Sequence, residues 1–174
     1  MSESDSRTHS GSMSQSMHRL FARAPAYRPL RAVQAADCAR LHAAGFSFAW
    51  SEEDFEQLLT DASVVADGAF DAEEALCGMI LSRAAADEAE ILTIAVAPER
   101  RRAGIGAALI RVHAPRLVAR GAARLFLEVD SGNLSARALY AAQGFRKVGE
   151  RKAYYRKADA PPASALLLRL DFDP

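Results

Sequence analysis

The hydrophobic and polar positions of this chain form short apolar runs, separated by segments that carry helix-capping and helix-ending residues. Short apolar or β-branched runs bounded by turn residues predict strands. A capping residue before a segment and a glycine after it predict a helix. The predicted strands cover residues 28–33, 62–66, 76–82, 90–96, 124–129, 145–156 and 166–172. The predicted helices cover residues 37–44, 51–59, 104–120 and 133–143.

The order of these elements places strands first and then alternates strands with helices. That order predicts an α/β (α+β) fold with a mixed sheet. Pro115 falls inside the third predicted helix, and because an interior proline removes a backbone hydrogen bond we expect a kink there. The serine-rich residues 1–26 carry no hydrophobic periodicity and are expected to be a disordered leader. Residues 27–174 are then predicted to form one domain.

Composition narrows the class of protein. Hydrophobic residues make up 50% and charged residues 25%, which is typical of a soluble globular chain. The formal net charge is zero, so we expect neither nucleic-acid binding nor membrane association. Acidic residues nevertheless dominate residues 51–90, and basic residues dominate 100–157. These are either two solvated surfaces, or an acidic half for a cationic ligand and a basic half for a polyanion.

The cysteines and histidines indicate the cellular compartment and whether a metal site is expected. Cys38 and Cys77 lie far apart in a chain without a recognisable signal peptide, which predicts a reduced, cytoplasmic protein. The four histidines lack metal-ligand spacing, so no metal site is expected. We expect a monomer or a weak dimer.

The most informative stretch is Glu99-Arg-Arg-Arg-Ala-Gly-Ile-Gly106, between a predicted strand and a predicted helix. A helix N-terminus binds anions through its unpaired N–H groups and its dipole. Gly104 and Gly106 lack a Cβ, so a phosphate could approach the backbone, and Arg101 and Arg102 add charge. The stretch lacks the Gly-Lys-Ser/Thr ending of a nucleotide-triphosphate loop. Taken alone, the glycine pair also fits an ordinary loop-to-helix turn.

The same stretch resembles the acetyl-CoA-binding segment of the GNAT superfamily of N-acetyltransferases. The superfamily pattern, Arg/Gln-x-x-Gly-x-Gly/Ala, is met by Arg101, Gly104 and Gly106. Residues 127–133 and 138–145 resemble its next strand and helix. The resemblance implies a mixed, mostly antiparallel sheet of about six to seven strands flanked by about four helices. It also implies that the anion is the pyrophosphate of coenzyme A.

Within the superfamily, the likeness is closest to the RimI type, which acetylates the N-terminal alanine of a ribosomal protein. It is carried by residues 90–96, 127–129, 139–140 and 144–145, together with Asn133, Trp50-Ser51 and Tyr154-Tyr155. It implies an acetyl-CoA-dependent N-acetyltransferase whose partner is a protein N-terminus. The cofactor-binding residues it implies are Ile94, Ala95, Val96, Arg101, Arg102, Ala103, Gly104, Ile105, Gly106, Ala107 and Asn133. The acceptor-binding candidates are Trp50, Glu90, Tyr154 and Tyr155.

Glu128 and Tyr140 are the candidate general base and general acid. Glu128 lies in an otherwise apolar strand, where a carboxylate needs either a catalytic task or an arginine partner. Tyr140 stays protonated at pH 7 and can donate to a leaving thiolate, or it can simply pack against the sheet. Asn133, two helical turns before Tyr140, could bind the cofactor, cap the helix, or do both.

Glu90 is a rival base, because the stretch around it resembles the strand that carries the catalytic glutamate in the histone-lysine branch of the superfamily. An α-amine with a pKa near 7.8 costs about 1 kcal/mol to deprotonate at pH 7, whereas lysine, near 10.4, costs roughly 4.6. Three functions therefore stay open. They are an N-terminal acetyltransferase with Glu128 and Tyr140, a lysine or small-amine acetyltransferase with Glu90, and a non-catalytic acyl-CoA sensor.

Overall fold

The computed structural model describes residues 24–157 and 160–172, and of residues 152–163 only the backbone. The described residues form one seven-stranded sheet with the order β1-β2-β3-β4-β5-β7-β6. The strands are β1 (Ala26–Pro29), β2 (Val64–Phe70), β3 (Leu76–Ala85), β4 (Glu88–Val96), β5 (Arg124–Asp130), β6 (Arg146–Lys157) and β7 (Ala160–Asp171). The helices are α2 (Ala35–Ala43), α3 (Glu52–Thr60), α4 (Ile105–Val118) and α5 (Leu134–Ala142), with short 3-10 turns η1 (Ala32–Gln34) and η2 (Pro98–Arg100).

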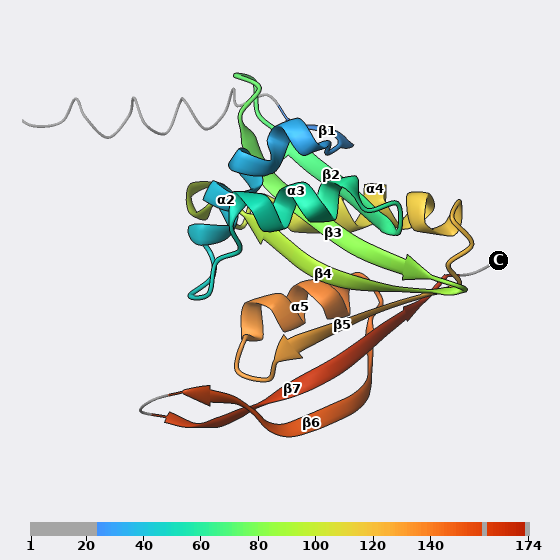
Figure 1. The fold of residues 1–174 in the computed structure, drawn as a ribbon. Coiled ribbons are helices and arrows are strands. Elements are labelled where there is room, and N and C mark those ends of the chain that lie inside the picture. The colour runs from blue at the N-terminus through green and yellow to red at the C-terminus, as the bar shows by residue number, and fades with distance from the viewer. Residues whose placement is uncertain (1–23, 158–159, 173–174) are drawn as a thin grey trace, which may run out of the picture.

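Neighbouring strands run antiparallel except β4 and β5, which run parallel. Figure 1 shows these two strands meeting at one end and separating toward the other, with α5 beside the gap. The predicted fold class, a mixed and mostly antiparallel sheet with helices around it, is confirmed. No helix within the described ranges is both long and apolar enough to cross a membrane.

Helices cover both faces of the first strands. All seven residues of β2 are buried, because α3 and α4 both contact this strand and lie on opposite sides of the sheet (Figure 1). On the α4 side the approach is close at Gly78 of β3. A Cβ added to Gly78 would lie 2.9 Å from Ile105 Cγ2 and 3.2 Å from Leu109 Cδ1.

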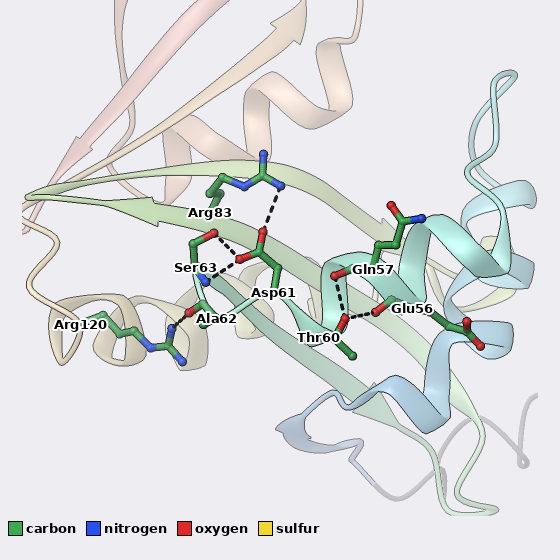
Figure 2. Close-up of polar contacts among 8 residues, drawn as sticks. All are labelled: Glu56, Gln57, Thr60, Asp61, Ala62, Ser63, Arg83 and Arg120. Carbon is green, nitrogen blue, oxygen red and sulfur yellow. Dashed lines mark hydrogen bonds and ion pairs between the residues drawn. The ribbon is translucent and has the colours of Figure 1, made fainter.

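Helix α3 is held at both ends by local hydrogen bonds. At its start, Ser51 Oγ accepts from Asp54 N at 3.1 Å and the Asp54 carboxylate accepts from Ser51 N at 2.7 Å, which confirms the predicted capping box. After its end, Asp61 accepts from Ser63 N at 2.8 Å and lies 3.6 Å from Arg83 of β3 (Figure 2). The end of α3 therefore lies on the face of β3 that carries Arg83.

Four predicted boundaries were wrong. The strand predicted over 28–33 ends at Pro29, and the chain turns into η1. The helix predicted from Asp37 begins two residues earlier, so Asp37 lies in its first turn instead of capping it. The strand predicted over 62–66 runs from 64 to 70 through Asp67, whose carboxylate is bound by α4 instead of standing in a turn. The strand predicted over 166–172 begins earlier, since it spans Ala160–Asp171.

The remaining elements fall close to their predicted positions. The helix predicted over 104–120 spans 105–118 and continues through Pro115, and its kink stays a prediction. Asn133 precedes α5 as the predicted cap, and Gly121 and Gly144 follow α4 and α5 with positive φ. The predicted leader lies outside the described residues except for its last three, so its disorder stays a prediction, as does the domain boundary.

Candidate functional site

The parallel strands β4 and β5 pair over three residues each, Glu88–Glu90 with Arg124–Phe126. Beyond these pairs the two strands separate, as Figure 1 shows. After Glu90, the backbone groups on the edge of β4 that faces β5 therefore form no hydrogen bonds with β5. They can bind a ligand instead. This edge includes Ile94–Val96, which were predicted to contact the cofactor.

A bulge in β4 lies where the two strands begin to separate. Leu81 of β3 pairs with Thr93, whereas Ser82 pairs with Ile91, so Leu92 is an extra residue in β4. Such a bulge bends the strand and changes the direction in which neighbouring side chains point. The strand therefore turns away from β5 at the residues that border the gap.

The first turn of α4 offers unpaired amides. The first bond inside the helix runs from Ala108 N to Gly104 O at 3.0 Å, so the amides of 105–107 have no partner within the helix. Gly104 caps this end with a φ of 79°, a left-handed conformation that favours glycine. The preceding residues turn sharply as well, since Arg102 has a φ of 65°. This geometry suits an anion, as the sequence predicted.

The arginines before α4 contact the protein itself. Arg101 Nε donates to the Val96 carbonyl at 3.2 Å, and Arg102 Nη1 lies 3.5 Å from Ser135 Oγ of α5. Arg100 donates to the Asp71 carboxylate at 3.2 Å. Both Arg101 and Arg102 are exposed, so they add positive charge beside the unpaired amides while tying the loop to β4 and α5.

Gly106 has a packing role. A Cβ added at this position would lie 3.1 Å from Leu139 Cδ2 of α5 and 4.0 Å from Val96 Cγ2. The missing side chain therefore lets α5 approach the first turn of α4. This differs from the reason expected from the sequence, which was room for a phosphate. A Cβ on Gly104, in contrast, would meet no atom within 4 Å.

Helix α5 positions Asn133 and Tyr140. Asn133 Oδ1 accepts from Ala136 N at 3.1 Å, so its capping role is confirmed and its contact with a cofactor stays a prediction. Tyr140 is buried, and its ring lies edge-on to Phe145 at 5.6 Å between ring centres. Burial raises the pKa of Tyr140 to about 12, so the phenol keeps its proton at physiological pH.

Glu128 and Glu90 point to the face opposite α4. His113 of α4 bonds to Ser82, so the next residue of β3, Arg83, points away from α4. Glu90 pairs with Arg83 and also with Phe126 of β5. Glu128, two residues after Phe126, therefore shares this face. Glu90 belongs to the last β4–β5 pair, whereas Glu128 lies within the gap.

Glu128 forms an ion pair with Arg151 of β6, at 3.2 Å. This confirms the arginine partner that the sequence left as an alternative to the catalytic role. The Glu128 side chain is 26% exposed and that of Arg151 is 59% exposed, so the pair is in contact with solvent. Such a pair contributes little to stability, so the contact does not by itself assign the carboxylate a structural role.

Trp50 belongs to an aromatic cluster over the same face. Its ring stacks on His42 at 4.9 Å between ring centres, and Phe46 stacks on His42 at 4.1 Å. Trp50 N also donates to His42 Nδ1 at 3.1 Å, and burial lowers the pKa of His42. Trp50, Arg83 and Leu92 help to line a cavity of about 390 Å³. The side chains of the other acceptor candidates, Tyr154 and Tyr155, lie outside the described residues.

The family model for the acetyltransferase (GNAT) family matches residues 35–145, which is more than half of the chain. The chain belongs to this family. The predicted superfamily is thereby confirmed, and acetyl-CoA, the expected co-substrate, is the one that GNAT acetyltransferases use.

Curated relatives of this GNAT chain include the [ribosomal protein bS18]-alanine N-acetyltransferase of Escherichia coli (strain K12), 37% identical over 84 residues. That alignment covers 48% of this chain and 57% of the relative. N-alpha-acetyltransferase RimI of Mycobacterium tuberculosis is 41% identical over 80 residues, 46% of this chain and 49% of the relative. The chain thus matches about half the length of these relatives.

Solved structures extend the likeness across the fold. The ribosomal-protein-S18-alanine N-acetyltransferase of Escherichia coli superposes with a TM-score of 0.78 at 26% identity, covering 86% of this chain and 95% of the other. NAA60 of Arabidopsis thaliana in complex with acetyl-CoA gives a TM-score of 0.74 at 18% identity, covering 85% and 98%. The second likeness is one of fold alone.

One buried cluster in this GNAT chain was not foreseen. His113 Nε2 lies 2.8 Å from Ser82 Oγ, and His113 Nδ1 lies 2.7 Å from Asp67 Oδ2, which is the order of a Ser-His-Asp triad. All three residues are at most 3% exposed, so no substrate reaches Ser82. Arg116 also binds Asp67 and donates to the Ala66 carbonyl at 3.0 Å. The cluster ties α4 to β2 and β3.

This cluster was missed because its members are 31 and 46 residues apart in sequence and no local pattern connects them. Among the described residues, no group of three or more His, Cys, Asp or Glu side chains is arranged to hold a metal ion. The expected absence of a metal site stays a prediction.

Proposed function

We propose that this chain transfers acetyl from acetyl-CoA to the α-amine at a protein N-terminus, with Glu128 as general base and Tyr140 as general acid. The observation that carries the proposal is the register of β4 and β5. The pairing ends at Glu90 and Phe126, so Glu128 is the first carboxylate beyond the point where the strands separate. A substrate in this gap meets a carboxylate from β5 and a buried phenol from α5.

The residues present fit coenzyme A. The amides of 105–107 and the left-handed Gly104 suit its diphosphate, with Arg101, Arg102 and Ala103 in the same loop. The edge of Ile94–Val96 suits the amide-rich pantetheine arm, because β5 does not use it. Asn133 stands at the start of α5, two residues before Ser135, the residue that Arg102 contacts.

Bound acetyl-CoA supplies a thioester whose carbonyl carbon forms a C–N bond with the amine while its C–S bond breaks. Glu128 takes one proton from the acceptor ammonium, so that the amine can attack with its lone pair. Tyr140 gives its proton to the sulfur as the thiolate leaves, and the second proton that the nitrogen loses on forming the amide restores the phenol. Because burial raises the pKa of Tyr140 to about 12, this residue enters each cycle as the protonated acid.

The proposed acceptor is an α-amine, in particular an N-terminal alanine of a ribosomal protein. The roughly 3.5 kcal/mol lower cost of deprotonating an α-amine at pH 7 suits a carboxylate base that is open to solvent. The names of the relatives, ribosomal protein bS18-alanine N-acetyltransferase and N-alpha-acetyltransferase RimI, support the same class of acceptor.

The expectations about cellular context belong to this proposal. The cysteines Cys38 and Cys77 are free thiols, and both are buried, which supports a reducing, cytoplasmic compartment. We propose that the enzyme works as a monomer or weak dimer and does not bind nucleic acid directly.

The test is acetylation of a peptide panel that differs at the first residue, alongside lysine peptides with a blocked N-terminus and polyamines. We expect alanine-starting peptides to be acetylated, and Glu128→Gln and Tyr140→Phe each to lower kcat by about 10²-fold or more while acetyl-CoA still binds. Glu90→Gln tests the rival base, a carboxylate that belongs to the last strand pair. If Glu90→Gln abolishes turnover and Glu128→Gln does not, the lysine or small-amine alternative replaces the proposal. A protein that binds acetyl-CoA but acetylates no amine is a sensor.

A further inference from the structure

Thr93 carries the one buried polar side-chain atom, among all described residues, that has no hydrogen-bond partner. The residue is 5% exposed, and the atom is Oγ1. The other buried polar side chains, those of His42, Asp67, Ser82 and His113, all have partners. Native interiors rarely leave such an atom unpaired, so each exception needs an explanation.

The unpaired hydroxyl lies at the proposed active site. Thr93 pairs with Leu81, two residues from Arg83 on β3, so Thr93 points to the same face as Arg83 and Glu90. Glu128 shares that face from β5. Thr93 also follows the extra bulge residue and lies beyond the last β4–β5 pair. The hydroxyl and the proposed base therefore come from the two strands that border the gap, on one side of the sheet.

Nothing on this face satisfies the hydroxyl, although Thr60, the other threonine among the described residues, is satisfied locally. Thr60 at the end of α3 donates to the carbonyls of Glu56 at 2.8 Å and Gln57 at 3.1 Å (Figure 2). Thr93 sits in a strand whose neighbours on this face are Leu81 and Ala95, and neither side chain can hydrogen-bond. The hydroxyl therefore remains available to a substrate group that enters through the gap.

We propose that Thr93 Oγ1 accepts a hydrogen bond from the acceptor amine. This bond orients the amine so that the lone pair of its nitrogen points at the thioester carbon. This inference rests on the proposed function. An ammonium has three N–H groups, of which Glu128 takes one as a proton. Thr93 holds a second, so the nitrogen stays oriented after it becomes neutral. Fixing the nucleophile in this way raises the rate without adding a catalytic group.

The test compares Thr93→Val, which removes the hydroxyl and keeps the shape, with Thr93→Ser, which keeps the hydroxyl. Thr60→Val is the matched control, because it removes a hydroxyl outside the gap. With an alanine-starting peptide, we expect Thr93→Val to lower kcat/KM for the peptide by about tenfold, the equivalent of one hydrogen bond. Thr93→Ser and Thr60→Val should stay within about threefold of the parent. Neither the affinity for acetyl-CoA nor the Tm should fall in Thr93→Val.

Unchanged kcat/KM in Thr93→Val overturns the inference, and so does a loss confined to acetyl-CoA binding or to Tm, which would mark a structural role. Calorimetry with a conjugate of coenzyme A and the peptide, joined through an acetyl group, separates this result from failure of the proposed function. If the parent protein acetylates no amine, the proposed function fails. The Thr93 inference then stands if the conjugate binds about tenfold more weakly to Thr93→Val, and falls if the affinities match.

Discussion

At the scale of single residues, burial sets the proton affinity of two groups on opposite sides of the fold. Tyr140 in α5 and Cys38 in α2 both have their pKa raised to about 12, in each case chiefly by burial. For Cys38 the nearby Asp37 carboxylate adds to the effect. Both side chains belong to the buried core, but only Tyr140 also borders the proposed site. A thiol that resists ionisation is also unreactive toward oxidants at neutral pH.

The raised pKa of Cys38 predicts how stability depends on pH. A group whose pKa is higher in the folded state keeps its full contribution below the unfolded pKa and loses it as the pH rises toward the folded value. For Cys38 this window runs from the reference value of 9.0 to about 12. Urea unfolding should show the parent losing about 1.4 kcal/mol per pH unit above pH 9, relative to Cys38→Ala. Parallel curves for the two proteins between pH 8 and pH 10 would contradict the prediction.

At the scale of elements, the position of α4 is fixed by a buried polar cluster as well as by apolar packing. His113 and Arg116 of α4 reach Asp67 of β2, and His113 also reaches Ser82 of β3. The first turn of the same helix carries the amides proposed to bind the diphosphate. In the low-dielectric core, a polar side chain that loses its hydrogen-bond partner is costly, so each residue of this cluster needs the others in place. The helix is therefore held at one orientation relative to the sheet.

Breaking this cluster should destabilise the fold strongly. His113→Ala removes two hydrogen bonds, leaves Ser82 unpaired and opens a cavity, so we expect the free energy of unfolding to fall by about 3 to 5 kcal/mol. Val112→Ala, at a neighbouring position of α4 that is 36% exposed, is the control and should cost under about 1 kcal/mol. Equal losses in the two variants, measured by urea unfolding, would show that the cluster adds no stability of its own.

The same elements show what the sequence could and could not predict. Sequence patterns that span only a few residues predicted helix ends correctly, because helix caps and chain reversals are local features. The Ser51 capping box and the Asn133 cap were both predicted. The cluster around His113 and the unpaired Thr93 hydroxyl were not, because they depend on which distant strands become neighbours. The wrong end predicted for β2 has the same cause. Asp67 is typical of turns, but it lies within the strand because His113 of α4 binds its carboxylate.

At the scale of the whole molecule, acidic and basic residues lie in different places, each beside the proposed site of one substrate. Helix α3 carries the acidic residues Glu52, Glu53, Asp54 and Glu56 and no basic residue, and it borders the same face as Glu90. The loop before α4 carries three consecutive arginines. The acidic face suits a cationic acceptor peptide, and the basic loop suits a diphosphate. Part of each charge pattern, the acidic residues of α3 and the arginines of this loop, therefore lies beside the site proposed for a substrate of opposite charge.

This sorting predicts a salt dependence that separates the two substrates. Exposed charges are screened by salt, so the KM for an alanine-starting peptide that carries several lysines should rise severalfold between about 50 and about 300 mM salt. Replacing Glu52, Glu53 and Glu56 together by glutamine should remove most of that rise, since Asp54 remains to cap α3 with Ser51. An uncharged alanine-starting peptide is the control, and its KM should be similar in both proteins at both salt concentrations. If the lysine peptide shows the same salt dependence with and without the three glutamates, the acidic face has no part in recognising the acceptor.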